Sequence, residues 1–434
     1  MSGRRVLGLV INPVAGLGGA AALKGSDGAE TQALARARGS RPRSGERAQR
    51  ALAGLPAGTE VLTAAGSMGA EAARAAGCAP LVRYRPGTPD PDAPAAGSTA
   101  APDASRAASA PDPDAPAAGS TAASDAPAAA STSPEDTIAT VRALAAAGAG
   151  LILFAGGDGT ARDVLRGLVD APGPVAVLGI PTGVKMYSSV FAVSPAAAGA
   201  VAAAWLRGAD LTWEEREVLD VSEAQLGAGI VDATLFGTAL TPVLRGRTQA
   251  RKAATGAADA DAVRGVAGGL VTRMHPDVTY LLGPGGTMRA VADALGVAKT
   301  PLGVDAVRDG RLVAADATAA QLIDLAKAGP SQAVVTVIGG QGFLLGRGNQ
   351  QFSPDLLRAL IDPPLLVGAT AAKLAALPGP LLVDTGDDAL DAALAGHVRV
   401  VTGPQDIGLV PVRPASAAPG GPPSAEEPRR EEHP

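Results

Sequence analysis

Aromatic residues, cysteine and histidine are scarce in this sequence of 434 residues. Aromatic side chains make up 2% of the chain, which argues against the stacking platforms that bind single-stranded nucleic acid. The single cysteine, Cys78, excludes an internal disulfide and fits a reducing cytoplasm. Because only three histidines exist, and His433 lies in the C-terminal tail, a three-histidine metal site is not expected. We predict no metal-ligand set in the chain itself.

Positive charge and long apolar runs are also lacking. The net charge of -5 disfavours nucleic acid and anionic membranes as partners, but small phosphorylated ligands remain possible. The apolar run at residues 6–11 is shorter than the roughly 7–15 residues of a secretory signal, and no run reaches the roughly 18 residues of a membrane span. We expect a cytoplasmic protein, a homo-oligomer, that binds small-molecule nucleotides without a nucleic acid or membrane partner.

Glycine is abundant, and its most informative cluster follows an apolar run at residues 151–160, LILFAGGDGT. A buried strand that leads through glycines into a helix can hold a phosphate, because backbone N–H groups and the helix dipole face the anion. A carboxylate in such a loop can accept a proton from a hydroxyl nucleophile. We predict that Asp158 is the catalytic base, with a turn or capping residue as the alternative. Gly156, Gly157 and Gly159 would let the backbone approach a phosphate.

The first half of the chain alternates apolar runs with helical patterns. Strands are expected at residues 6–11, 60–63, 80–84, 151–155 and 174–180. This alternation predicts an α/β fold with a doubly wound, mostly parallel sheet, and ligands bind beyond the carboxyl ends of such strands. The glycine loops at residues 156–160 and 181–186 lie at such ends. We assign residues 1–207 to an N-terminal nucleotide-binding domain.

The rest of the chain reads differently. Residues 208–412 are predicted to form a second domain that mixes antiparallel β-structure, at residues 217–244, with α/β units further on. One such unit contains a hairpin that turns at Asp309-Gly310. Residues 86–134 repeat one 13-residue segment of Pro, Ala, Asp, Gly, Ser and Thr, and residues 413–434 are rich in Pro and charge. We expect both to be disordered, the first as a neutral insertion rather than a regulatory segment.

Polar residues in the glycine-rich loops are candidates for nucleotide or phosphate contact. Asn12 follows the first strand, where an Asx-turn is the alternative to ligand binding. Thr160 suits a helix N-cap that also touches phosphate. Asp384 and Asp387 have the chemistry of metal ligands, although an N-cap is favoured for Asp387. Together with the three loop glycines, Gly156, Gly157 and Gly159, the candidates for nucleotide or phosphate binding are Asn12, Thr160, Arg162, Thr182, Gly183, Lys185, Arg347 and Asn349.

Several motifs together resemble one family. They lie at residues 12–19, 23–28, 154–163, 179–186, 339–351 and 383–387. This set resembles the ATP-NAD kinase family of the NAD kinase/diacylglycerol kinase superfamily, in its acetoin-catabolism protein X-like branch. The resemblance implies an enzyme that uses ATP and a divalent metal such as Mg²⁺ to phosphorylate the adenosine ribose 2′-hydroxyl of NAD, giving NADP. It also implies that the loop aspartate, here Asp158, is catalytic.

The chain departs from the family pattern in two ways. Typical NAD kinases carry an Asn-Glu pair that holds the nucleotide substrate, but the two asparagines of this chain, Asn12 and Asn349, do not precede a glutamate. The second half of typical members is all-β, whereas residues 278–401 read as α/β. The alternatives are a kinase for another small-molecule or lipid hydroxyl, or a non-catalytic nucleotide-binding accessory protein of acetoin catabolism. The phosphate donor, ATP or polyphosphate, also stays open.

Overall fold

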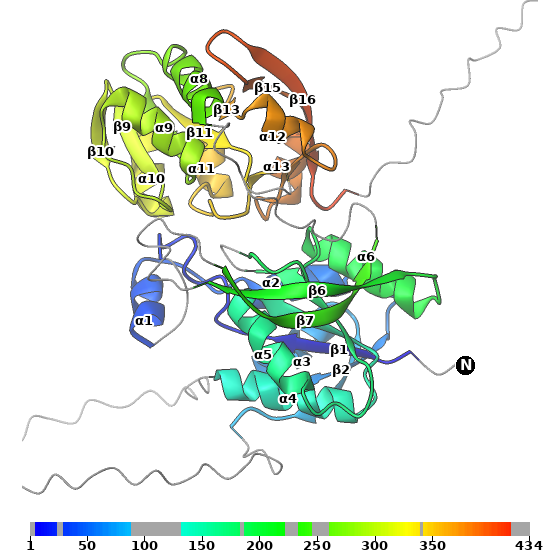
Figure 1. Ribbon diagram of the computed structural model, residues 1–434. Coiled ribbons are helices and arrows are strands. Elements are labelled where there is room, and N and C mark those ends of the chain that lie inside the picture. Colours follow the sequence, from blue (N-terminus) through cyan, green and yellow to red (C-terminus); the bar gives the residue numbers. More distant parts are fainter. Residues whose placement is uncertain are drawn as a thin grey trace, which may run out of the picture.

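The computed structural model describes residues 5–23, 29–87, 132–182, 186–221, 233–244, 260–338 and 342–417. Figure 1 shows two lobes, each built on its own sheet. Most of the predicted insertion, together with Gly183 and Lys185, lies outside the described residues. None of the described helices is long and apolar enough to cross a membrane.

The first lobe is built on a five-stranded parallel sheet. Its strands are β1 (Leu7–Ile11), β2 (Glu60–Ala64), β3 (Ala79–Tyr84), β4 (Leu151–Gly156) and β5 (Ala176–Pro181). The strand order is β3-β2-β1-β4-β5. The chain therefore moves outward from β1 to β3, returns to β4 beside β1, and then moves the other way. This confirms the predicted doubly wound sheet, and the reversal between β1 and β4 is where such sheets bind ligands.

Helices cover both faces of this sheet, which explains why its central strands are continuously apolar. They are α2 (Ser44–Leu52), α3 (Ala70–Ala75), α4 (Pro134–Ala146), α5 (Asp158–Leu168) and α6 (Pro195–Leu206), whereas α1 (Ala29–Ala37) packs on the loop after β1 through Ala35. Leu9 and Ile11 of β1 pack in one core cluster with residues of α2 and α6. Val10 points to the other face, in a cluster with residues of α4 and α5. The alternation along β1 thus divides the core into two layers.

A long antiparallel ribbon completes the first lobe. It consists of β6 (Thr212–Val221) and β7 (Ala233–Val243), which lie in front of the sheet in Figure 1. Val218 and Ala239 are buried in the same cluster as Phe154 of β4. The antiparallel structure predicted for this region is therefore present, and its buried residues share a core with the first sheet.

The second lobe contains a nine-stranded mixed sheet in the order β10-β9-β8-β11-β13-β15-β16-β14-β12. Its strands are β8 (Thr279–Leu282), β9 (Asp305–Arg308), β10 (Arg311–Ala314), β11 (Ser331–Thr336), β12 (Phe343–Leu345), β13 (Leu365–Gly368), β14 (Leu381–Val383), β15 (Gly396–Val401) and β16 (Ile407–Pro414). β8, β11, β13 and β15 are parallel, whereas the β9–β10 hairpin and the β15–β16 pair are antiparallel. This mixture confirms the predicted fold class.

The helices of the second lobe are α8 (Ala260–Val271), α9 (Gly286–Leu295), α10 (Ala319–Ala328), α11 (Pro354–Ala359), α12 (Ala371–Ala375) and α13 (Asp388–Ala393). The β9–β10 hairpin turns at Asp309 and Gly310, which have φ values of 50° and 69°. Positive φ at both positions is the requirement of a two-residue turn between twisted strands, as Asp-Gly predicts.

The predicted boundary of the disordered tail, at residue 413, is wrong. Arg413 and Pro414 belong to β16 and pair with β14, and Ala415 is buried in a core cluster of the first lobe. The β16 segment contains two prolines and a glycine, so its local sequence pattern indicates a loop. Pairing with β14 on one side and β15 on the other outweighs that local preference.

The two lobes are joined by apolar and charged contacts. Phe343 of β12 packs in the same cluster as the α2 and α6 residues. Arg47 of α2 forms a buried ion pair with Asp384, and Arg50 donates a hydrogen bond of 2.7 Å to the Gly386 carbonyl. Ala319 N of α10 also donates to the Ala20 carbonyl at 3.1 Å. These contacts hold the second lobe against α2 and the loop after β1.

Candidate active site

The ends of β1 and β4 meet at the strand-order reversal. Asn12, directly after β1, donates a side-chain hydrogen bond of 3.1 Å to Thr160 Oγ1, and its backbone N donates to the Ala155 carbonyl at 3.0 Å. Asn12 Oδ1 also accepts from Val14 N at 3.2 Å, so the Asx-turn foreseen as the alternative is present. The loop after β1 is thereby tied to the glycine loop after β4.

The glycine loop leads directly into α5. The helix begins at Asp158, with Gly157 at the N-cap, so the predicted N-cap at Thr160 is wrong. The buried Thr160 packs back against Gly156, where an added Cβ would lie 2.3 Å from Thr160 Cβ. Glycine at 156 therefore allows this close approach. Gly157 has no side chain to cap the helix, and no side-chain cap hydrogen bond is present at this end of α5 among the described residues, so the first turn suits an anion.

Asp158 is held by a segment that lies 29 and 30 residues further along the chain. Its Oδ2 accepts a hydrogen bond of 2.7 Å from Tyr187 N, and its Oδ1 accepts one of 3.0 Å from Ser188 N. Burial, and then the negative charge of Asp158, raise the pKa of the Tyr187 phenol. We call residues 186–193 the strap. Sequence patterns did not reveal it, because its contacts are not local.

The strap is anchored to β5 and β6. Gly179 N of β5 donates to the Val190 carbonyl at 2.9 Å, and a Cβ added at Gly179 would lie 2.2 Å from the Phe191 ring. Ser188 Oγ accepts from Leu219 N of β6 at 3.0 Å. The two backbone donors that hold Asp158 are therefore part of a packed layer between the sheet and the ribbon.

Two further predicted residues lie beside the loop. Arg162 is half-buried on α5, with its Nε 3.6 Å from Asp163 Oδ1. Thr182 follows β5 and donates its backbone N–H to the Gly156 carbonyl at 3.2 Å. Its buried Oγ1 has no hydrogen-bond partner in the part of the chain that the structure describes. A Cβ at Gly16 would lie 2.5 Å from the Thr182 carbonyl oxygen, so the loop after β1 also passes here.

Arg347 and Asn349 lie in the loop after β12, and both are buried. The Arg347 guanidinium donates to the Val193 carbonyl at 2.6 Å and stacks on Phe343, with 4.7 Å between its central carbon and the ring centroid. Burial lowers the pKa of Arg347 to about 9. Asn349 donates to the Leu344 carbonyl at 2.8 Å. The described contacts of both side chains are within the protein, and nucleotide binding by them stays a prediction.

The two aspartates considered as metal ligands have structural partners. Asp384 is buried in the ion pair with Arg47. Asp387 is the N-cap of α13, accepts from Leu390 N at 2.9 Å, and pairs with Arg358 at 2.5 Å. The N-cap favoured for Asp387 is confirmed. The described residues contain no group of three or more His, Cys, Asp or Glu side chains placed to hold a metal ion.

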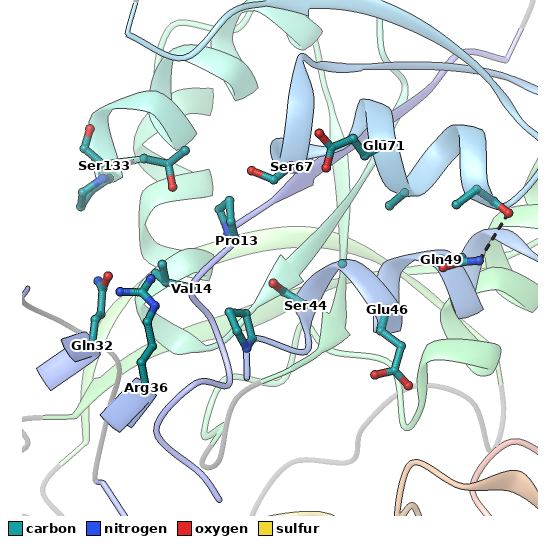
Figure 2. A pocket seen from close by; sticks show the side chains of 16 residues that line it. Pro13, Val14, Gln32, Arg36, Ser44, Glu46, Gln49, Ser67, Glu71 and Ser133 are labelled. Atoms are coloured by element: carbon teal, nitrogen blue, oxygen red, sulfur yellow. Dashed lines mark hydrogen bonds between the residues drawn. The ribbon is translucent and has the colours of Figure 1, made fainter. Parts of the chain in front are cut away.

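A pocket of about 890 Å³ lies beyond the carboxyl ends of β1 and β2. Figure 2 shows Ser44 between Pro13 and Glu46, with Ser67 and Glu71 above them in the view. Ser44 is the first residue of α2, and its fully buried Oγ finds no hydrogen-bond partner among the described residues. The remaining lining residues are Val14, Gln32, Arg36, Pro42, Gly45, Gln49, Ala72, Ala75, Thr132, Ser133 and Pro134.

The pocket cannot be recognised from the sequence, because its walls come from five separate segments of the chain. The only local signal at Ser44 was a serine at the start of a helix, which is common in proteins without ligands. The pocket adjoins the predicted site through Pro13 and Val14, which directly follow Asn12. A ligand in it would therefore touch the segment that follows Asn12, whose side chain is hydrogen-bonded to Thr160 after the glycine loop.

Comparison with known families agrees with this geometry. The chain matches the model of the ATP-NAD kinase N-terminal domain over residues 8–209 and that of the ATP-NAD kinase C-terminal domain over residues 276–412. It therefore belongs to the ATP-NAD kinase family, whose members are kinase-type phosphotransferases. No curated protein and no solved structure matches the chain. The predicted family is confirmed, whereas the acetoin-related branch stays a prediction.

Proposed function

We propose that this chain transfers the γ-phosphoryl group of ATP to the adenosine ribose 2′-hydroxyl of NAD, giving NADP and ADP. The observation that carries the proposal is the position of Asp158. Its carboxylate lies at the reversal between β1 and β4 and is oriented by the backbone N–H groups of Tyr187 and Ser188. A fixed carboxylate beside a phosphate-binding loop is what transfer to a hydroxyl requires.

Asp158 acts as the general base in this proposal. The ribose hydroxyl oxygen attacks the γ-phosphorus and forms a new O–P bond, while the bond from that phosphorus to the β-phosphate oxygen breaks. The hydroxyl proton passes to the Asp158 carboxylate, and ADP leaves with the bonding electron pair. Both carboxylate oxygens are held at 2.7 and 3.0 Å by the strap, so the base is oriented before the substrate arrives.

The first turn of α5 supplies the charge stabilisation. Its N-cap, Gly157, allows a phosphate to approach the backbone closely, and the positive end of the helix dipole points at the same place. Negative charge develops on the phosphoryl oxygens in the transition state, and preorganised N–H donors stabilise it there. The space beside Gly159 is open to a phosphate, because a Cβ added at this position would meet nothing within 4 Å.

The pocket beside the loop supports a place for the donor nucleotide. Its volume of about 890 Å³ falls in the range of small-molecule sites, roughly 300–1,000 Å³. Ser44 and the N-terminus of α2 offer donors to a phosphate, and Arg36 lines the same pocket. Glu71, which follows β2, suits the ribose hydroxyls of a nucleotide.

A divalent metal such as Mg²⁺ fits this arrangement as part of the donor complex. Mg²⁺ is usually held by one or two carboxylates together with substrate phosphates. The absence of a three-ligand cluster among the described residues is compatible with that mode, and Asp158 is the carboxylate in the glycine loop. When bound, the metal would neutralise phosphate charge.

The proposal is tested with purified protein, ATP, Mg²⁺ and NAD, and a dehydrogenase that accepts only NADP as the readout. Wild-type protein should form NADP, and Asp158→Asn should lower the rate by about 1,000-fold, because the amide cannot accept the proton. NADP formation at the same rate in both proteins would refute the role of Asp158. Replacing ATP by polyphosphate in the same assay identifies the donor.

A second candidate is a kinase for another small-molecule hydroxyl. The observation that favours it is the missing Asn-Glu pair, since the two asparagines, Asn12 and Asn349, do not precede glutamate. This candidate predicts ADP release with a sugar, polyol or lipid acceptor but not with NAD. ATP binding without ADP release for every acceptor in such a screen would instead indicate a nucleotide-binding accessory protein.

A further inference from the structure

One guanidinium of the second lobe touches both ends of the strap. Arg347 donates to the Val193 carbonyl at 2.6 Å and to the Ala192 carbonyl at 3.3 Å, at the C-terminal end of the strap. Its other terminal nitrogen lies 3.8 Å from Met186 Sδ, at the N-terminal end. Between these ends lie Tyr187 and Ser188, whose N–H groups hold Asp158.

We propose that Arg347 is a positioning residue through which the second lobe fixes the carboxylate of Asp158. The structural part of this inference, that Arg347 orders the strap, holds whatever the acceptor is. Its kinetic consequence rests on the proposed function. The first lobe alone then contains the base and the strap that holds it, but lacks the residue that restrains both ends of the strap.

Arg347 is itself rigidly placed. Its guanidinium stacks on Phe343, and Asn349 Oδ1 accepts from Gly346 N at 3.0 Å within the same loop. Gly346 has φ 93°, and a Cβ added there would lie 1.9 Å from the Asp384 carbonyl oxygen. The loop that carries Arg347 therefore packs directly against the backbone of Asp384, and only glycine fits at position 346. Because the backbone of Arg347 is held in this loop and its guanidinium plane is stacked on a ring, the side chain loses little conformational entropy when it binds the strap carbonyls.

The contacts of Arg347 require a planar guanidinium, because Nη2 donates to both carbonyls, Nη1 lies against Met186 Sδ and the plane lies over the Phe343 ring. A lysine ammonium could donate to the two carbonyls, but it has no second nitrogen to reach Met186 and no flat face to lie on the ring. Loss of the guanidinium leaves the Ala192 and Val193 carbonyls without their donor from the second lobe. The strap then keeps its ties to β5 and β6 and loses the restraint across its ends, so the expected effect is local loosening without unfolding.

The experiment compares Arg347→Met and the milder Arg347→Lys with wild type in the full-length chain. Hydrogen exchange of the Tyr187 and Ser188 amides should accelerate about tenfold in Arg347→Met, and less in Arg347→Lys, because the opening of the strap becomes easier. Arg50→Met is the matched control, since it removes another contact between the lobes, the bond to the Gly386 carbonyl, that does not touch the strap. Its strap exchange should equal that of wild type.

Kinetics then separate positioning from binding. In Arg347→Met the kcat for NADP formation should fall about 100-fold while KM for ATP changes by less than about threefold, because misplacement of the base affects chemistry. Unchanged strap exchange in both folded Arg347 variants would overturn the proposal, as would equal acceleration in Arg50→Met. Accelerated strap exchange in a protein whose wild type forms no NADP would support the positioning role and reject the proposed function instead.

Discussion

Two buried hydroxyls near the glycine loop lack hydrogen-bond partners among the described residues. Ser44 Oγ is buried at the pocket wall, and Thr182 Oγ1 is buried in a residue that donates its backbone N–H to the Gly156 carbonyl. An unsatisfied buried polar group costs about 1–3 kcal/mol, and a ligand, an ion or an ordered water can satisfy it. Removing the hydroxyl group of Ser44 or Thr182 is therefore the most direct test of whether a single side-chain atom binds a ligand.

Ser44→Ala should weaken ATP binding without destabilising the protein. Loss of a hydrogen bond to a charged phosphate should raise the dissociation constant about tenfold, whereas unfolding free energy should stay equal or rise by up to about 1 kcal/mol. Calorimetric titration and urea unfolding measure the two quantities. Thr140→Ala is the matched control, because Thr140 Oγ1 is buried and donates to the Asp136 carbonyl at 2.6 Å. It should lose stability and keep ATP affinity; the same behaviour in Ser44→Ala would contradict the assignment.

Close packing between elements limits which helix positions accept a side chain. Within α8, a Cβ at Gly268 would meet nothing within 4 Å, whereas a Cβ at Gly269 would lie 2.3 Å from the Gly403 carbonyl oxygen. Gly403 follows β15, so α8 contacts the backbone beyond the end of that strand. Two adjacent glycines in one helix therefore have opposite roles, one incidental and one required for packing.

This contrast gives a paired prediction for the second lobe. Gly268→Ala should stabilise the protein by up to about 1 kcal/mol, because alanine has the higher helix propensity. Gly269→Ala should destabilise it by about 1–3 kcal/mol, because the backbone carbonyl cannot move aside easily. Thermal unfolding of the two variants under identical conditions measures the difference. Equal melting temperatures would show that α8 does not pack this closely.

At the scale of the whole molecule, buried charge joins the two lobes. Asp384 is paired with Arg47, and its negative charge also acts on Arg43 and Arg347. Burial lowers the pKa values of Arg43 and Arg347, and the charge of Asp384 opposes this effect. One carboxylate therefore balances several guanidinium groups at the contact between the lobes.

The two partners of this pair should not be equivalent. Asp384→Asn leaves the arginines to repel one another, and we expect a loss of about 3–5 kcal/mol. Arg47→Met leaves Asp384 near two other cations and should cost less than half as much. Urea unfolding of the full-length protein measures both losses. A larger loss in Arg47→Met than in Asp384→Asn would contradict this account of the contact.

The sequence was sufficient for features that depend on neighbouring residues. The strand–glycine–helix stretch around Asp158 and the hairpin at Asp309-Gly310 were predictable because local sequence determines them. The strap and the contacts of Arg347 were not, since Tyr187 lies 29 residues from Asp158 and Arg347 154 residues from Val193. β16 was missed because pairing with β15, which precedes it, and with β14 further back in the chain orders a segment that reads locally as a loop.

The most direct test of the central claim is a single-turnover measurement with radiolabelled ATP, Mg²⁺ and NAD, combined with ATP titration of the same samples. We predict that Asp158→Asn lowers the rate of phosphoryl transfer to the 2′-hydroxyl by about 1,000-fold, while the dissociation constant for ATP changes by less than about threefold. Equal transfer rates in wild type and Asp158→Asn, with ATP bound to both, would contradict Asp158 as the base.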